Sequence, residues 1–134
     1  MEIKKMKYGL FIPLVIALLI QSMNDVRSAE WSLYFQDDSL PLKQQYYIDN
    51  GSIRSTPEGT ILVWRKSVST IKNIPKIWIE ELREVDCSRY RFKVLQGTVW
   101  RPSYRVIEPD DWYFYTPDDM SLAFFETVCG EGNK

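Results

Sequence analysis

Apolar and polar side chains alternate along several short segments of this sequence, which is the pattern of half-buried β-strands. In the segment 31–36, the side chains of Trp31, Leu33 and Phe35 fall on one face, and smaller or polar-tipped groups fall on the other. A second short extended piece follows at 45–49. Both segments are therefore predicted to be strands with one face turned towards a core.

Turn signals divide the next part of the chain. Asn50-Gly51 and Pro57–Gly59 are residues that favour tight turns. The segment 60–68 is rich in β-branched and aromatic residues on both of its alternating faces, which favours a more central strand. Residues 71–75 are expected to link this strand to the next segment.

The segment 77–87 is compatible with either a helix or a strand, because it mixes glutamates and arginine with β-branched residues and a tryptophan. The alternating segment that follows favours a strand in a long β-hairpin. A two-residue turn at Ser88-Arg89 would pair opposite charges on one face and apolar residues on the other: Asp86 with Arg91, Glu84 with Lys93, Val85 with Phe92, and Cys87 with Tyr90.

Short apolar segments after Gly97 predict one or two more strands. A helix is then expected from Thr116 onwards. Thr116 is predicted to be the N-cap, followed by Pro117 at the first helical position and acidic residues in the first turn. Gly130 is a stop signal. Apolar residues recur between these ends at helical spacing: Met120, Ala123, Phe124, Thr127 and Val128, with Leu122, Phe125 and Cys129 alongside.

The N-terminal residues have the composition of an export signal. Lysines in the first eight residues precede an uncharged apolar run from Gly9 to Ile20. That run is shorter than the roughly 20 apolar residues of a membrane-spanning helix. A signal peptide over residues 1–28 is therefore expected, with an uncleaved anchor as the alternative. No cysteine lies near this boundary for lipid attachment, so the mature protein is expected to be unanchored if the signal is cleaved. The signal itself leads us to expect an exported protein that is in the periplasm, secreted or at the cell surface.

The sequence contains two cysteines, Cys87 and Cys129, and an even count in an oxidising compartment favours one disulfide. A metal site and a nucleophilic thiol are the alternatives, and both call for partners such as histidine, which is absent from the sequence. The predicted fold class is α+β, in one domain over residues 29–134. It comprises an antiparallel sheet of about five or six strands with a C-terminal helix packed on one face and tethered by the disulfide.

Composition narrows the classes of function. The net charge of −1 argues against nucleic acid as the main partner, because phosphate binding calls for concentrated positive charge. The aromatic content of 14% is too high for a disordered chain. Histidine, a glycine-rich phosphate loop and a nucleophile elbow are all missing from the sequence, so we expect no enzymatic activity and no cofactor.

Two groups of residues are candidates for binding. Arg89, Arg91 and Lys93 form a basic stripe suited to an acidic partner or a sulfated glycan, although cross-strand pairing with Glu84 and Asp86 is the role we favour. An aromatic group could line a binding platform, but we expect most of its members to pack beneath the helix: Trp100, Tyr104, Trp112, Tyr113 and Tyr115.

An acidic segment follows these aromatic residues along the chain. Glu108, Asp110 and Asp111 could hold calcium or act as a carboxylate pair. A solvated loop is the better interpretation, because acidic side chains are mostly exposed. We therefore expect no metal site.

A series of landmarks spans nearly all of the mature chain: Trp31 opening a strand, Tyr46–Asp49 followed by Ser52-Ile53, Val63-Trp64, Val85–Cys87 followed by Tyr90-Arg91, Trp112, and Val128-Cys129. In this order the sequence resembles the bacterial surface-adhesin protein E family. The resemblance implies an antiparallel sheet with a disulfide-tethered C-terminal helix, and an adhesive role in which the domain binds host extracellular matrix or serum proteins. The alternative is an envelope domain that binds glycan or is structural. Exposed sheet edges would allow a homodimer.

Overall fold

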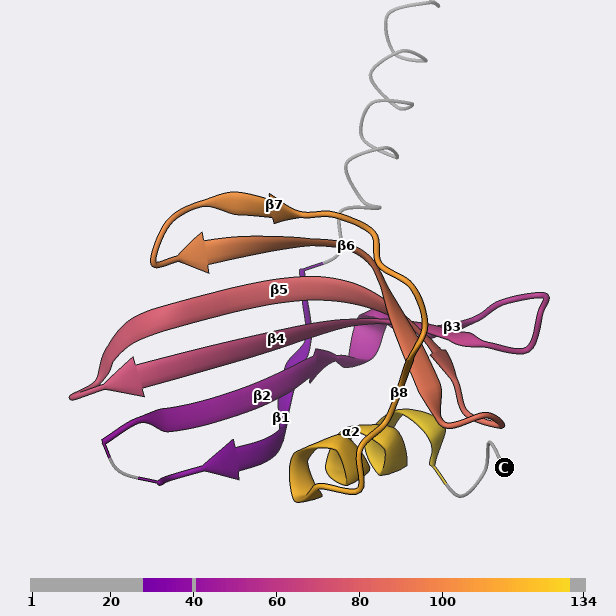
Figure 1. Cartoon of the computed structure of the whole chain (residues 1–134), viewed down its shortest axis with the longest axis horizontal. Helices are drawn as coiled ribbons and strands as arrows, with labels where there is room; N and C mark the ends of the chain where they lie inside the picture. Colours follow the sequence, from indigo (N-terminus) through magenta and orange to yellow (C-terminus); the bar gives the residue numbers. More distant parts are fainter. Residues whose placement is uncertain (1–27, 40, 131–134) are drawn as a thin grey trace, which may run out of the picture.

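The computed structural model describes residues 28–39 and 41–130, so that the predicted export signal lies outside the described residues except for Ser28. The described chain forms one antiparallel sheet and one α-helix (Figure 1). The strands are β1 (Trp31–Asp37), β2 (Lys43–Asp49), β3 (Arg54–Ser55), β4 (Ile61–Ile71), β5 (Ile74–Asp86), β6 (Arg91–Arg101), β7 (Arg105–Ile107) and β8 (Tyr113–Phe114). The 3₁₀ turn η1 covers Asn50–Ser52, and the helix α2 covers Asp119–Cys129.

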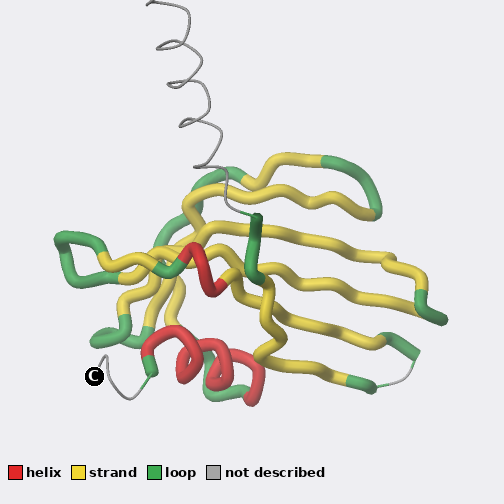
Figure 2. Tube along the Cα trace, turned by 180° about the vertical axis from the view of Figure 1, so that it is seen from behind, coloured by secondary structure: helices red, strands yellow, loops and turns green. Residues whose placement is uncertain are grey.

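The sheet has the strand order β1-β2-β4-β5-β6-β7, with β3 paired to β4 and β8 paired to β6. This architecture confirms the predicted fold class. The count of eight strands exceeds the predicted five or six because β3, β7 and β8 are only two or three residues long. The sheet is strongly curved, and α2 lies against one end of its inner side (Figures 1 and 2).

Three long strands of 11, 13 and 11 residues, β4, β5 and β6, form the middle of the sheet. The strand interpretation of 77–87 is correct, and β5 begins earlier, at Ile74. The link expected at 71–75 is instead a tight turn at Lys72 and Asn73, whose φ angles are 51° and 65°. Positive φ at both central residues matches the twist of paired strands, so the two strands continue almost to the turn.

The β5–β6 hairpin has the predicted register. Asp86 pairs with Arg91, Glu84 with Lys93, and Val85 with Phe92. The predicted pair of Cys87 with Tyr90 and the two-residue turn at Ser88-Arg89 are wrong. The turn covers residues 87–90, and Tyr90 adopts a positive φ of 53° within it.

β6 also continues through Gly97, where the sequence suggested an end. A side chain at Gly97 would place its Cβ 2.8 Å from the carbonyl oxygen of Glu80, so glycine allows the close approach of β5.

The core lies between α2 and the inner side of the sheet. Phe124 is fully buried, and Phe125, Val128 and Cys129 are buried beside it. The sheet contributes an apolar layer to the same cluster: Ile48, Ile61, Val63 and Val85. The helix is therefore held mainly by its last two turns, and Leu122, which the sequence placed on the broad apolar face, is half exposed.

Two local predictions are wrong, one in β1 and one at the start of α2. In β1, the pairing shifts between Leu33 and Phe35, so that Tyr34 packs edge-on against Phe124 while Leu33 is exposed. The helix N-cap is Asp118 rather than Thr116, and its carboxylate accepts a hydrogen bond from the Ser121 backbone N–H at 2.7 Å. A carboxylate is also favourable beside the positive end of the helix dipole.

The aromatic group predicted to pack beneath the helix is mostly elsewhere. Tyr115 does contact Phe124 and Phe125, with ring centroids 5.8 and 5.6 Å apart. Trp100, Tyr104 and Tyr113 are instead exposed. The reason is that the helix covers the strand ends near β1 and β4, whereas Trp100 and Tyr104 belong to the opposite end of β6 and the β7 connection.

Cys87 and Cys129 form the predicted disulfide, with a Cα–Cα distance of 5.8 Å. It joins the β5–β6 turn to the last turn of α2, in keeping with a protein of an oxidising compartment outside the cytoplasm. No helix within residues 28–39 and 41–130 has the length and apolarity needed to cross a bilayer.

Removing the disulfide is expected to destabilise the domain strongly. The bridge closes a loop with a sequence separation of 42 residues. The double variant Cys87→Ala/Cys129→Ala should therefore lose about 4 kcal/mol of unfolding free energy, measured by urea denaturation. The control Glu126→Ala, on the exposed side of the same helix, should lose less than about 0.5 kcal/mol. An equal midpoint for the double variant and the unmodified protein would contradict this expectation.

Candidate functional site

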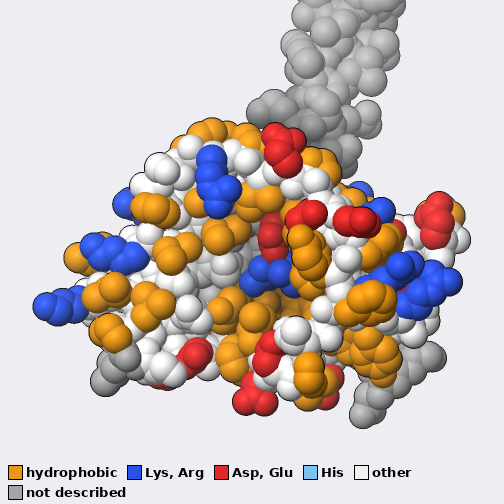
Figure 3. Space-filling view, in the orientation of Figure 1, with side chains coloured by type: hydrophobic (Ala, Val, Ile, Leu, Met, Phe, Trp, Pro, Cys, Tyr) orange, Lys and Arg blue, Asp and Glu red, His pale blue; other side chains and the backbone are white. Residues whose placement is uncertain are grey.

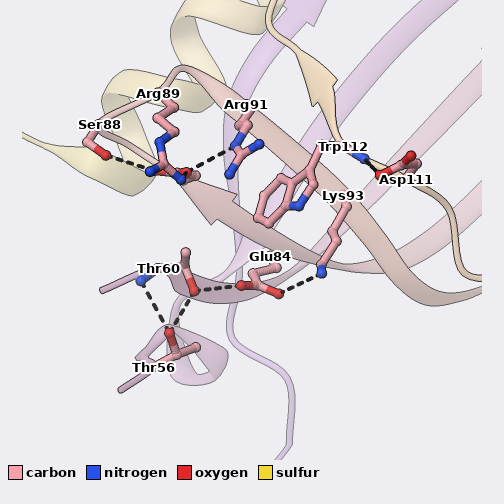
Figure 4. Close-up of polar contacts among 10 residues, drawn as sticks. Thr56, Thr60, Glu84, Ser88, Arg89, Arg91, Lys93, Asp111 and Trp112 are labelled. Carbon is pink, nitrogen blue, oxygen red and sulfur yellow. Dashed lines mark hydrogen bonds and ion pairs between the residues drawn. The ribbon is translucent and has the colours of Figure 1, made fainter. Parts of the chain in front are cut away.

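The predicted basic stripe lies on the outer side of the β5–β6 hairpin, facing away from α2. Nε of Arg91 is 3.1 Å from a carboxylate oxygen of Asp86, and Nζ of Lys93 is 3.6 Å from one of Glu84 (Figure 4). Arg89 is 69% exposed and is 3.6 Å from Asp86. The cross-strand ion pairs predicted from the sequence are therefore present, and much of the positive charge is already neutralised within the chain.

Trp112 joins this stripe from the loop before β8. Its indole ring lies 4.3 Å from the Arg91 guanidinium carbon and 4.7 Å from Lys93 Nζ, so one ring spans both cations (Figure 4). Cations above an aromatic face are attracted by its negative quadrupole. We call Arg91, Trp112 and Lys93 the cation–tryptophan ladder.

The carboxylates under the ladder are fixed by further hydrogen bonds. Glu84 accepts a 2.8 Å hydrogen bond from the Thr60 hydroxyl, which ties the ladder to the β3–β4 turn (Figure 4). Burial opposes the ionisation of Asp86, but hydrogen bonds from Ser88 and Arg91 hold the pKa of Asp86 below its usual value. The ladder is thus a preorganised surface rather than a set of free side chains.

The structure does not bring Trp100, another predicted binding residue, to this ladder. Trp100 lies near the other end of β6, where its ring centroid is 5.6 Å from that of Tyr104, and both side chains are exposed. Two aromatic surfaces therefore stand apart on the sheet, where the sequence suggested one platform.

The acidic residues of the β7–β8 connection are engaged in shaping their loop. Asp110 accepts a 2.7 Å hydrogen bond from the Tyr113 hydroxyl, and Asp111 accepts one of the same length from the Trp112 backbone N–H. Among the described residues, histidine, cysteine and acidic side chains form no group suited to a metal ion. The Asp111 contact instead helps to place the Trp112 indole.

A lysine on the outer side of the sheet was missed by the sequence analysis. Nζ of Lys66 lies 4.5 Å from the Trp31 ring centroid and 4.7 Å from that of Tyr47, with Trp78 at 5.8 Å. Burial lowers the pKa of Lys66, although Glu80 opposes the shift. This cation is enclosed by the protein's own rings, so its role is structural.

The inner side of the sheet holds a second missed feature, a buried cluster of Arg65, Glu81 and Arg83. Oε1 of Glu81 lies 2.6 Å from Nη1 of Arg65 and 2.8 Å from Nη2 of Arg83. All three side chains are about nine-tenths buried. We call this the guanidinium cluster, and its three groups carry a net charge of +1.

Strand alternation was the signal that could have revealed this cluster. Arg65 follows Ile61 and Val63 at two-residue steps, and these are core positions of β4. Glu81 and Arg83 precede the buried Val85 in the same way. Charges in register with buried apolar residues on paired strands must lie on the inner side.

Aromatic rings surround the guanidinium cluster. The Arg83 guanidinium carbon lies 4.0 Å from the Phe92 ring centroid and 5.0 Å from that of Phe124. The hydroxyls of Tyr34 and Tyr115 face Arg65 and Arg83, but neither makes a hydrogen bond of normal geometry. Nε of Arg65 is likewise buried without a partner among the described residues. The cluster therefore has unused donors.

Electrostatics distinguish the two arginines. Burial and repulsion by Arg65 lower the pKa of Arg83, despite the attraction of Glu81. Burial would also lower the pKa of Arg65, but Tyr34 and Glu81 raise it above its usual value. Burial raises the pKa of Tyr115, so this hydroxyl stays protonated. Arg83 is thus the cation whose charge is less well compensated.

A hollow opens beside Arg83 on the inner side, between β8 and the start of α2. Its volume is about 260 Å³. Figure 3 shows this side of the molecule with a hollowed centre, where basic and acidic side chains are visible among hydrophobic ones. The walls are largely aromatic, and the residues lining the hollow are Arg83, Phe92, Tyr113, Phe114, Tyr115, Thr116, Asp118, Met120 and Ser121.

Comparison with known proteins adds no assignment for these surfaces. No family model, curated protein or solved structure matches the chain. The function must therefore be argued from the residues themselves.

Removing the shared carboxylate of the guanidinium cluster is expected to destabilise the fold. Glu81→Gln leaves two buried cations without a counter-charge, which should cost roughly 3–5 kcal/mol in urea denaturation. The matched control is Glu84→Gln on the outer side of the same strand, where a partly exposed pair is worth up to about 1 kcal/mol. Equal losses for the two variants would show that the cluster is not electrostatically coupled.

The same carboxylate should make stability depend on acid. Burial opposes the ionisation of Glu81, but Arg83 and Arg65 outweigh it and lower the pKa of Glu81. Its contribution is therefore complete above the unfolded glutamate pKa of about 4.3 and is lost as the pH falls through the lower folded value. Unfolding free energy measured from about pH 5 downwards should fall more steeply in the unmodified protein than in Glu81→Gln. Parallel curves would contradict this assignment.

Proposed function

We propose that this protein is an exported, non-enzymatic binding protein with an adhesin-like role, as its resemblance to the surface-adhesin protein E family implies. Its partner would be a protein, such as a component of host extracellular matrix. The observation that carries the proposal is the cation–tryptophan ladder, in which Trp112 is held against Arg91 and Lys93 on the outer side of the sheet.

Such a ladder has the chemistry of a binding hot spot. Tryptophan and arginine are enriched among residues that dominate interface energies, because they offer large contact areas with polar edges. The ion pairs with Asp86 and Glu84 restrain both cations before a partner arrives. This restraint lowers the entropic cost of binding. Arg89, at the hairpin tip, would extend the surface towards an acidic group of the partner.

The disulfide supports the proposal that the protein is exported. The Cys87–Cys129 disulfide is stable only where thiols are not kept reduced. We propose that residues 1–28 act as the signal peptide and that the domain resides in the periplasm or outside the cell. Both cysteines are oxidised and histidine is absent from the sequence, so the protein lacks a free thiol nucleophile and the most common general base, which favours binding over catalysis.

An envelope glycan-binding domain is the second candidate, and the exposed pair Trp100 and Tyr104 favours it. Sugar rings stack on flat aromatic faces whose polar tips stay hydrated. This pair is distant from the ladder along β6, so the two functions can be separated by mutation.

Trp112→Ala is expected to weaken binding to the matrix protein that the intact protein recognises. The measurement is surface plasmon resonance with purified mature protein against immobilised laminin, fibronectin, collagen and vitronectin. Removing a central tryptophan should raise the dissociation constant roughly 30-fold or more, because hot-spot truncations cost at least about 2 kcal/mol. Circular dichroism checks that the variant is folded.

Trp100→Ala serves as the matched control, because it removes an equally large exposed ring at the other end of β6. It should leave matrix-protein binding unchanged. Absence of binding to the whole panel, or equal binding by Trp112→Ala, would refute the adhesin proposal. Selective carbohydrate-array signals that Trp100→Ala abolishes would establish the glycan candidate instead.

A further inference from the structure

We propose that the hollow between β8 and α2 binds the carboxylate of a small apolar acid, with Arg83 as its charge partner. This site lies on the inner side of the sheet and is separate from the cation–tryptophan ladder. It does not depend on the adhesin proposal.

The Arg83 side chain is held in one orientation. Nε and Nη2 both lie 2.8 Å from Oε1 of Glu81, and the rings of Phe92 and Phe124 lie near the guanidinium carbon. The Tyr115 hydroxyl faces the same guanidinium and is buried without a hydrogen bond of normal geometry. Because Arg83 and Tyr115 both line the hollow, this fixed cation and this unpartnered hydroxyl are placed to meet a ligand there.

The charge of the site favours one monoanion. Arg65 and Arg83 share the single carboxylate of Glu81, so the guanidinium cluster retains one positive charge in a poorly hydrated environment. A bound carboxylate would neutralise that charge and accept hydrogen bonds from Arg83 and from the Tyr115 hydroxyl, which has no partner of normal geometry. A dianion such as phosphate would leave an excess negative charge among aromatic walls, at a high desolvation cost.

One acidic residue stands at the rim of the hollow. The exposed Asp118 is occupied by the Ser121 backbone N–H, at 2.7 Å, and by the hydroxyl of Thr116. The Asp118 carboxylate therefore interacts with the start of α2 and not with the interior of the hollow. The ligand carboxylate therefore belongs at the Arg83 end, and its apolar part belongs between Asp118 and the aromatic walls.

The walls and volume set the rest of the ligand. Phe92, Tyr113, Tyr115 and Met120 offer apolar surface, and two of them bear no charged or hydroxyl group. The volume of about 260 Å³ lies below the roughly 300–1,000 Å³ of drug-sized pockets. A single ring with a short carboxylate arm matches this combination.

Phenylacetate is the probe, and uncharged phenylacetamide of nearly the same shape is its control. Binding to the purified mature protein is followed by amide chemical shifts in two-dimensional NMR. We expect saturable shifts with phenylacetate and an affinity for phenylacetamide that is at least ten times lower. Equal affinity for the two compounds, or saturable binding by neither, would overturn the proposal.

Two variants at the site and one control on the outer side locate the binding. Arg83→Gln should lower the affinity for phenylacetate at least tenfold, while Trp112→Ala on the outer side should leave that affinity unchanged. Tyr113→Ala should weaken binding several-fold, because the Tyr113 ring lies beside Phe92 on the inner side. The Tyr113 side chain is already 50% exposed, so this variant tests the wall even where Arg83→Gln fails to fold. Unchanged affinity in folded Arg83→Gln or in Tyr113→Ala would refute the assignment. Matrix-protein binding is measured on the same samples, so the two proposals stand or fall separately.

Discussion

The length of the helix α2 relative to the sheet is the constraint on which the rest of the described structure depends. The 11 residues of α2 extend about 16 Å, whereas the 13 residues of β5 extend about 43 Å. One short helix therefore covers only one end of the inner side. The disulfide and the buried side chains of Phe124 and Val128 fix it there. The remaining inner surface must be stabilised by other means or left open to a ligand.

The guanidinium cluster lies at the boundary between the covered and the open part of this surface. Burying charges costs more than burying apolar groups, and a buried ion pair often contributes little to net stability. Two guanidinium groups around Glu81 therefore stabilise a core less well than apolar side chains would. They do provide a charged and ordered surface next to the hollow. The unpartnered Tyr115 hydroxyl beside Arg83 agrees with a role in recognition.

The general fold could be predicted from the sequence because it depends on local patterns. Alternation defined the long strands, and matching charges defined the register of β5 and β6. The bulge at Tyr34 and the capping by Asp118 depend on tertiary packing, which propensity does not encode. For the site, the pairing of Arg91 with Asp86 was predictable, whereas the approach of Trp112 depends on a loop conformation. The guanidinium cluster was predictable in principle, by following alternation into charged positions.

β5 connects the two proposed surfaces, because its alternating residues supply the carboxylates of both. Glu81 points to the inner side and neutralises the arginines there, while Glu84 and Asp86 point to the outer side and hold the ladder. A shift of one residue in pairing would exchange these faces and separate the carboxylates from their present partners. The same strand register that builds the core therefore also determines both binding chemistries, and the close approach at Gly97 helps to fix it.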